Sequence, residues 1–87
     1  MEKIISFEEM ERLKEKYLEN KEDCIEKIVD LIIKQGIIRK ASDIHILPYR
    51  KKVIVKYRID GVLYPVLEIP SELHEGIIVK IKVNKLI

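Results

Sequence analysis

The feature of this sequence that most constrains its fold is a pair of alternating apolar segments joined by Asp60-Gly61. Residues 53–59 place a large apolar side chain at every second position, which is the period of a half-buried β-strand. Asp-Gly is a preferred two-residue hairpin loop, because both of its residues adopt positive φ more readily than most. The sequence therefore predicts an antiparallel β-hairpin around this dipeptide.

A two-residue loop also sets the register of the hairpin. The predicted cross-strand pairs are Ile59 with Val62, Tyr57 with Tyr64, and Val55 with Val66. Counting Val53 as well, seven apolar residues then share one surface of the hairpin. Other parts of the chain must cover that surface.

The opposite surface of the hairpin mixes charged and apolar residues. There Lys56 and Arg58 stand beside Pro65 and Leu63, so that cationic side chains lie next to an apolar strand. We interpret this surface as a docking face. Pro65 cannot donate a hydrogen bond to a strand ladder, which favours an edge position for its strand.

Two further segments flank the hairpin. Residues 43–47 alternate as a strand, and residues 48–51 supply the turn that follows it. On the other side, Pro70-Ser71-Glu72 resembles a helix start, whereas residues 79–83 alternate like a strand. The local pattern leaves the choice between helix and strand open for this C-terminal segment.

Two helices are predicted before the strands. Ser6 and Glu9 have the spacing of a capping box, and the apolar stripe that follows predicts an amphipathic helix ending near Asn20. We expect the charged residues of this helix to be solvated. A second, well-buried helix is predicted from Asp23, and it ends between residues 36 and 40.

Composition restricts the class of protein. Eighty-seven residues, 47% hydrophobic and 37% charged, fit one small globular domain over 1–87, and a net charge of +2 is too small to imply a nucleic-acid partner. Cys24 is the only cysteine, which excludes an intrachain disulfide, and its spacing from His45 and His74 does not match structural zinc. We therefore expect no metal and a reduced, cytoplasmic setting. No apolar run reaches the ~18 residues that span a bilayer, so we expect no direct membrane insertion.

Two motifs carry a family resemblance. The first is A-S-D-I-H-I-x-P-Y at residues 41–49, and the second is V-x-Y-R-I-D-G-V-L at residues 55–63. Together they resemble the N-terminal domain of the type II secretion and type IV pilus assembly ATPases (GspE/PilB-like). The likeness extends over residues 23–83 and leaves the N-terminal helix, within residues 1–22, outside it.

The resemblance implies an α+β fold: two N-terminal helices, a three-stranded antiparallel meander and a C-terminal helix over residues 71–83, as part of a PAS-like N-terminal domain. In that family a RecA-like motor with Walker motifs follows, and the subunits form hexamers. This chain contains no G-x-x-x-x-G-K-[ST] motif. We therefore expect no catalytic residue and no cofactor in it, and ATP and Mg²⁺ only with the motor domain.

The resemblance assigns such a domain contacts with the motor domain and with neighbouring subunits of the hexamer. In some members arginines also approach the phosphates of the nucleotide. Arg58 is the best matching candidate, because a guanidinium stays charged and offers a planar fork of donors. A structural interdomain contact and an ordinary surface arginine remain open as alternatives. Lys56 is a weaker candidate, because the family usually has arginine there and a lysine lacks the fork.

The other motif residues have structural explanations. Asp43 is interpreted as a cap at the start of its strand, and His45 as a residue that hydrogen-bonds across the sheet. Asp60 and Gly61 are interpreted as turn residues. Two positions depart from the family pattern: Leu47 replaces a common glutamate, and Lys40 replaces a glycine that usually ends the preceding helix.

Two other functions stay open. One is a free-standing binding module for a nucleotide, a single-stranded nucleic acid or a protein partner, with Lys52, Lys56 and Arg58 on its binding face. Nucleic acid is disfavoured, because Tyr57 and Tyr64 are predicted on the opposite surface and leave no stacking platform. The other is self-association through an unpaired sheet edge. If the resemblance holds, the protein is cytoplasmic and peripheral to the inner membrane through a secretion or pilus machine.

Overall fold

The computed structural model of this chain describes residues 3–20 and 22–85. The elements in chain order are α1 (Phe7–Glu19), α2 (Cys24–Ile38), β1 (Asp43–Pro48), β2 (Lys52–Ile59), β3 (Val62–Pro70), the 3-10 turn η1 (Ser71–Leu73) and α3 (His74–Lys85). The predicted α+β order is confirmed. The disputed C-terminal segment is a helix, as the family resemblance implied.

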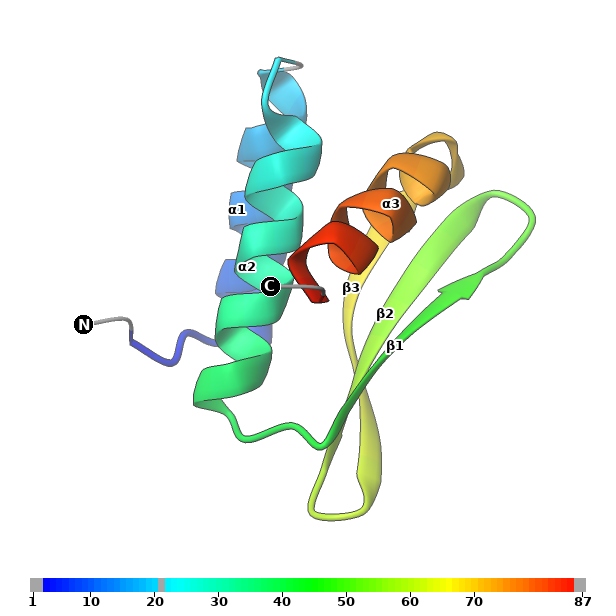
Figure 1. Ribbon diagram of the computed structural model, residues 1–87. Helices are drawn as coiled ribbons and strands as arrows, with labels where there is room; N and C mark the ends of the chain where they lie inside the picture. The colour runs from blue at the N-terminus through cyan, green and yellow to red at the C-terminus, as the bar shows by residue number, and fades with distance from the viewer. Residues whose placement is uncertain (1–2, 21, 86–87) are drawn as a thin grey trace.

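The three strands form one antiparallel sheet in the order β1-β2-β3, so β3 is an edge strand, as Pro65 predicted. The helices α1 and α2 lie side by side, and α3 packs against α2 (Figure 1). The tip of the β2–β3 hairpin extends past the helices at the bottom of that view. In the described ranges, no helix is long and apolar enough to cross a membrane.

The core lies between the sheet and the helices. Its fully buried side chains include Met10, Ile28, Val29, Ile32, Val53, Val55, Tyr57 and Ile77. Tyr57 occupies the centre of the sheet, and its hydroxyl donates a 2.5 Å hydrogen bond to the carbonyl of Ile32 in α2. This bond satisfies the one polar group that the buried ring carries into the core. Burial raises the pKa of Tyr57 well above its ordinary value.

Helix α1 begins where the capping box predicted. The hydroxyl of Ser6 accepts a 3.0 Å hydrogen bond from the backbone N–H of Glu9. The expectation that all charged residues of this helix are solvated is wrong for Lys14, which is only 5% exposed. Lys14 follows Met10 by four residues and precedes Tyr17 by three, so it lies on the apolar stripe and faces the rest of the protein.

The hairpin around Asp60 and Gly61 is confirmed. Both residues have positive φ, 51° and 80°, as a two-residue loop of this hand requires. The register begins as predicted, with Ile59 opposite Val62 and Tyr57 opposite Tyr64.

The third predicted pair is wrong, because Val55 lies opposite Leu67 and not Val66. Val66 is an extra residue in β3, a β-bulge that directly follows Pro65. Pro65 has no N–H for the ladder, and a bulge beside it lets pairing resume one residue later. As a result Val66 and Leu67, which are neighbours in the chain, are both buried.

Helix α2 ends at Ile38, within the predicted range. The N–H of Lys40 bonds to the carbonyl of Ile37, and the N–H of Ala41 bonds to the carbonyl of Gly36, the two bonds of a Schellman motif. Lys40 has a φ of 60°, so a lysine occupies the left-handed position that glycine usually takes.

Candidate docking face of the sheet

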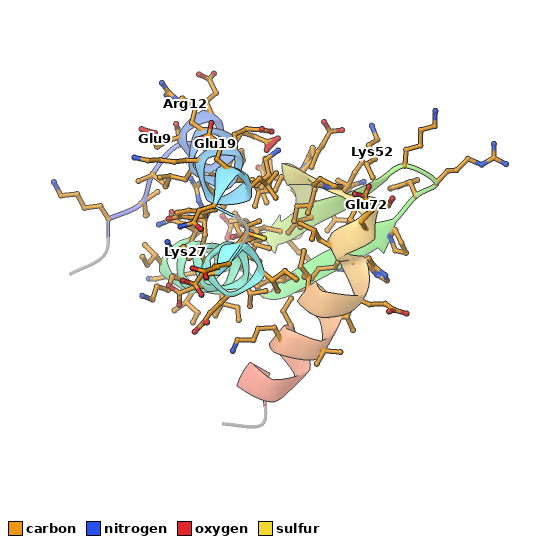
Figure 2. The ribbon with its side chains drawn as sticks, turned by 90° about the horizontal axis from the view of Figure 1, so that it is seen from above. Glu9, Arg12, Glu19, Lys27, Lys52 and Glu72 are labelled. Atoms are coloured by element: carbon orange, nitrogen blue, oxygen red, sulfur yellow. The ribbon has the colours of Figure 1, made fainter. Side chains whose placement is uncertain are left out.

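One face of the sheet, which we call the open face, is not covered by α2 or α3, and among the described helices α1 borders it at the β3 edge. In Figure 2, α3 lies on one side of the strands and the labelled Lys52 lies on the other. Because side chains alternate along a strand, the residues that pair with Lys52 or with every second residue after it share that side. The open face comprises Asp43, His45, Leu47, Lys52, Ile54, Lys56, Arg58, Leu63, Pro65 and Glu68.

Nine of these ten residues form three rows across the sheet, and Lys52 pairs with Pro70. The rows are Asp43–Arg58–Leu63, His45–Lys56–Pro65 and Leu47–Ile54–Glu68. Lys56 and Arg58 therefore each have a polar neighbour on β1 and an apolar neighbour on β3. The predicted placement of Lys56 and Arg58 beside Pro65 and Leu63 is confirmed.

Arg58 is held in place by β1. Its Nε donates to Oδ2 of Asp43 at 3.1 Å, and the two side chains are 37% and 55% exposed. The backbone N–H of Ser42 binds the carbonyl of Arg58 at 2.9 Å. Asp43 is thus the ion-pair partner of Arg58, and Ser42 supplies the backbone contact at the start of β1. Because the pair is exposed, it orients the guanidinium more than it stabilises the fold.

Lys56 and His45 are direct cross-strand partners, and both are half-buried. The Nε2 atom of His45 is buried and has no hydrogen-bond partner among the described residues. The predicted cross-sheet hydrogen bond is therefore not made by this nitrogen. Asp60 and Gly61 lie at the exposed hairpin tip, away from the rows that contain the two cations.

The open face continues into a shallow groove beside α1. The groove has a volume of about 280 Å³ and is lined by Phe7, Glu8, Glu11, Ile54, Pro65, Val66, Leu67 and Glu68. Its walls combine apolar residues from the sheet with carboxylates from α1. The candidate docking face is therefore basic and apolar at its centre and acidic at this border.

A surface ion pair lies at the same border. Nζ of Lys52 lies 2.8 Å from Oε1 of Glu68, and both side chains are more than half exposed. The hydrogen bond and the charge of Glu68 raise the pKa of Lys52, and those of Lys52 lower the pKa of Glu68. Such an exposed pair contributes little to stability.

Sequence reasoning missed two buried polar residues, Lys14 and Gln35. Nζ of Lys14 donates to the carbonyl of Glu68 at 2.7 Å and lies within 2.9 Å of carboxylate oxygens of Glu11 and Glu15. Desolvation lowers the pKa of Lys14, but the hydrogen bonds and charges of the two glutamates outweigh it, and the pKa is raised. The position of Lys14 on the apolar stripe was the signal in the sequence.

Gln35 is 3% exposed and binds the N-terminal segment. Its Oε1 accepts from the backbone N–H of Ile5 at 3.1 Å, and its Nε2 donates to the carbonyl of Lys3 at 2.8 Å. The guanidinium of Arg39 also donates to the carbonyl of Ile5 and lies over the ring of Phe7. No local sequence pattern predicts these contacts, because they join residues about thirty positions apart.

Comparison with known proteins agrees with the two motifs. The type IV pilus assembly ATPase PilB of Myxococcus xanthus is 37% identical over 79 residues, which are 91% of this chain and 14% of that protein. Type II secretion system protein E of Pseudomonas aeruginosa is 37% identical over 70 residues, which are 79% of this chain and 14% of that protein. The chain thus spans about 14% of the length of these relatives. The sequence model of the family described as Type II/IV secretion system protein matches residues 18–86, and the chain therefore belongs to that family.

Proposed function

We propose that this chain is a non-catalytic N-terminal region of a type II secretion or type IV pilus assembly ATPase. It acts through contacts with a RecA-like motor domain and with neighbouring subunits of a hexamer. The observation that carries this proposal is the open face, where Lys56 and Arg58 stand between apolar residues and no helix of the described chain covers them. The names of the relatives, which include ATPases of pilus assembly, support the same assignment.

The chemistry of the open face suits a protein partner. Interfaces between proteins favour arginine and apolar side chains at their centre and polar residues at their rim. Asp43 engages Nε of Arg58, and a guanidinium has four further N–H donors for a carboxylate or a phosphate. We assign Arg58 to an interdomain contact, and direct approach to the phosphates of a nucleotide is the competing role.

The nucleotide belongs to the motor domain in this proposal. ATP and Mg²⁺ bind there, and this region contributes its open face to the interface around them. The protein then works at the cytoplasmic side of the inner membrane, held there by the secretion or pilus machine. Its partners are the motor domain and the adjacent subunits.

The test joins this region to its cognate motor domain and measures ATP turnover and hexamer assembly for the parent and for Arg58→Ala. The proposal expects Arg58→Ala to lower turnover or assembly at least several-fold. The matched control is Arg12→Ala, because Arg12 is an exposed arginine on α1 whose side chain is 71% exposed and lies off the open face. Arg12→Ala should behave like the parent protein.

Two outcomes separate the roles of Arg58. Loss of assembly with normal turnover per hexamer assigns Arg58 to an interdomain contact, and loss of turnover in intact hexamers assigns it to the nucleotide. Unchanged turnover and assembly would reject a role for Arg58. If the region also fails to bind the motor domain, the proposed function is rejected with it.

A further inference from the structure

We propose that α1 caps the outer edge of β3, and that this edge, once the cap is weakened, pairs with the β1 edge of a second copy of this chain. The inference rests on contacts of α1 that lie outside the rows of the open face containing the two cations. It is therefore independent of the proposed function. It concerns how the fold prevents one of its own edge strands from pairing.

The cap acts on the backbone of Glu68. The carbonyl of Glu68 accepts a 2.7 Å hydrogen bond from Nζ of Lys14, and its N–H donates to Oε2 of Glu11 at 3.4 Å. One donor and one acceptor are what a neighbouring strand would offer at the same position. Two side chains of α1 thus take the place of a fourth strand.

The burial of Lys14 makes this cap strong. A lysine that is 5% exposed is destabilising unless its charge is paired, and Lys14 is paired with Glu11 and Glu15 at 2.8 and 2.9 Å. If α1 moves away, these three charges regain water, but the carbonyl of Glu68 loses its charged donor. The edge and the helix are therefore coupled through one side chain.

The rest of the β3 edge is also protected. Pro65 and Pro70 have no N–H, so they interrupt the row of donors on this strand at two positions, and Glu68 lies between them. The ring of Phe7 at the start of α1 lies 6.5 Å from the ring of Tyr64. Helix α1 therefore contacts the β3 edge on both sides of Pro65.

The occupant that fits the released edge is β1 of a second copy. The sheet order β1-β2-β3 leaves β1 as the other outer strand, and no described strand pairs with its outer edge. Unpaired edges of this kind favour pairing with another chain. A net charge of +2 gives little electrostatic repulsion between copies. A contact from β3 to β1 is head-to-tail, so it produces an open chain or a ring of subunits instead of a two-fold symmetric dimer.

The experiment compares the whole chain with Lys14→Met, which keeps the length and the apolar stem of the side chain and removes the charge. Amide hydrogen exchange reports on the edge, and sedimentation velocity over a concentration series reports on association. We expect exchange at the Glu68 amide to rise roughly tenfold and the apparent dissociation constant to fall roughly tenfold, which is about 1.4 kcal/mol. Arg12→Met, on the exposed side of the same helix, is the matched control and should match the parent.

A second variant keeps the test decisive. Adding Glu68→Pro to Lys14→Met removes the edge donor and should restore the parent's association behaviour. If Lys14→Met fails to fold by circular dichroism, Glu11→Gln replaces it as a milder release of the same edge. The proposal is overturned if the folded variants show no faster exchange at Glu68, if a variant with faster exchange associates no more than the parent, or if the Glu68→Pro double variant still associates.

Discussion

The two faces of β2 differ in burial, as two neighbouring residues on this strand show. Tyr57 points to the helices, is fully buried and donates its hydroxyl to α2. Arg58, the next residue, points to the open face, where its side chain is 37% exposed and is paired with the exposed carboxylate of Asp43. The difference shows that one strand packs into the core on one side and presents an exposed, charged surface on the other.

This division has a physical basis in the pleat of the strand. Successive side chains point to opposite faces, so one sequence can satisfy a dry core and a solvated surface at the same time. Each apolar atom that is buried in the core stabilises the fold, whereas solvent and salt weaken the attraction within an exposed ion pair. Substitutions on the covered face should therefore change stability, and those on the open face should change binding.

The largest expected effect tests this division directly. Tyr57→Ala removes a buried ring and should cost about 3–5 kcal/mol, against a total stability of about 4–13 kcal/mol for a chain of this length. Arg58→Ala should stay within about 0.5 kcal/mol of the parent. Urea denaturation measures both. A cost for Arg58→Ala equal to that for Tyr57→Ala would contradict the division.

A smaller effect isolates the hydroxyl on the covered face. Tyr57→Phe removes the hydrogen bond to Ile32 and should cost about 1–2 kcal/mol at neutral pH. Because burial raises the folded pKa of Tyr57, its contribution is complete below about pH 10 and is lost as the pH rises toward the folded pKa. The parent should therefore lose stability at alkaline pH more steeply than Tyr57→Phe.

The Tyr57→Phe variant should still lose some stability at alkaline pH. The pKa of Lys14 is also raised in the folded state, so its contribution is lost in the same direction. Denaturation midpoints of the parent and of Tyr57→Phe between pH 8 and about pH 11 give the slope of stability against pH for each protein. Identical slopes for the parent and Tyr57→Phe would show that Tyr57 does not titrate with unfolding.

A substitution in the loop between α2 and β1, which lies on neither face of the sheet, should also change the stability of the protein. Lys40 has a φ of 60°, and Lys40→Gly should stabilise the protein by about 0.5–1 kcal/mol because glycine adopts this conformation without strain. The same change at the exposed Lys16, in the last turn of α1, should destabilise by up to about 1 kcal/mol, since glycine is a poor helix former and the favourable interaction of the lysine with the helix dipole is lost. Thermal unfolding of both variants checks the opposite signs.

The smallest effect is expected on the open face itself. A double-mutant cycle with Asp43→Asn and Arg58→Ala should give a coupling free energy of about 0.2–1 kcal/mol. Added salt should reduce it, because the pair is solvent-exposed and screened. A coupling above about 2 kcal/mol that is insensitive to salt would place this pair with the buried contacts of the covered face.

The open face was predictable from residue order, because the period of two and the Asp60-Gly61 turn place Lys56 and Arg58 beside Pro65 and Leu63. The ion pair of Arg58 with Asp43 was not predicted, since it depends on how β1 aligns with β2. The expected hydrogen bond of His45 is absent at Nε2 for a related reason, because the position alone does not say what lies against the ring.

The sequence by itself determined the two N-terminal helices, the alternation of the strands and the hairpin turn, because these depend on backbone preferences and side-chain periods within a few neighbouring residues. Tertiary structure decided the rest. Residues 79–83 alternate like a strand but are helical, and Ile77 on the same helix is fully buried against the core. The bulge at Val66 and the burial of Lys14 are tertiary as well, since Lys14 bonds to a carbonyl 54 positions away. Contacts over such separations form only when the elements pack together, and no local pattern contains them.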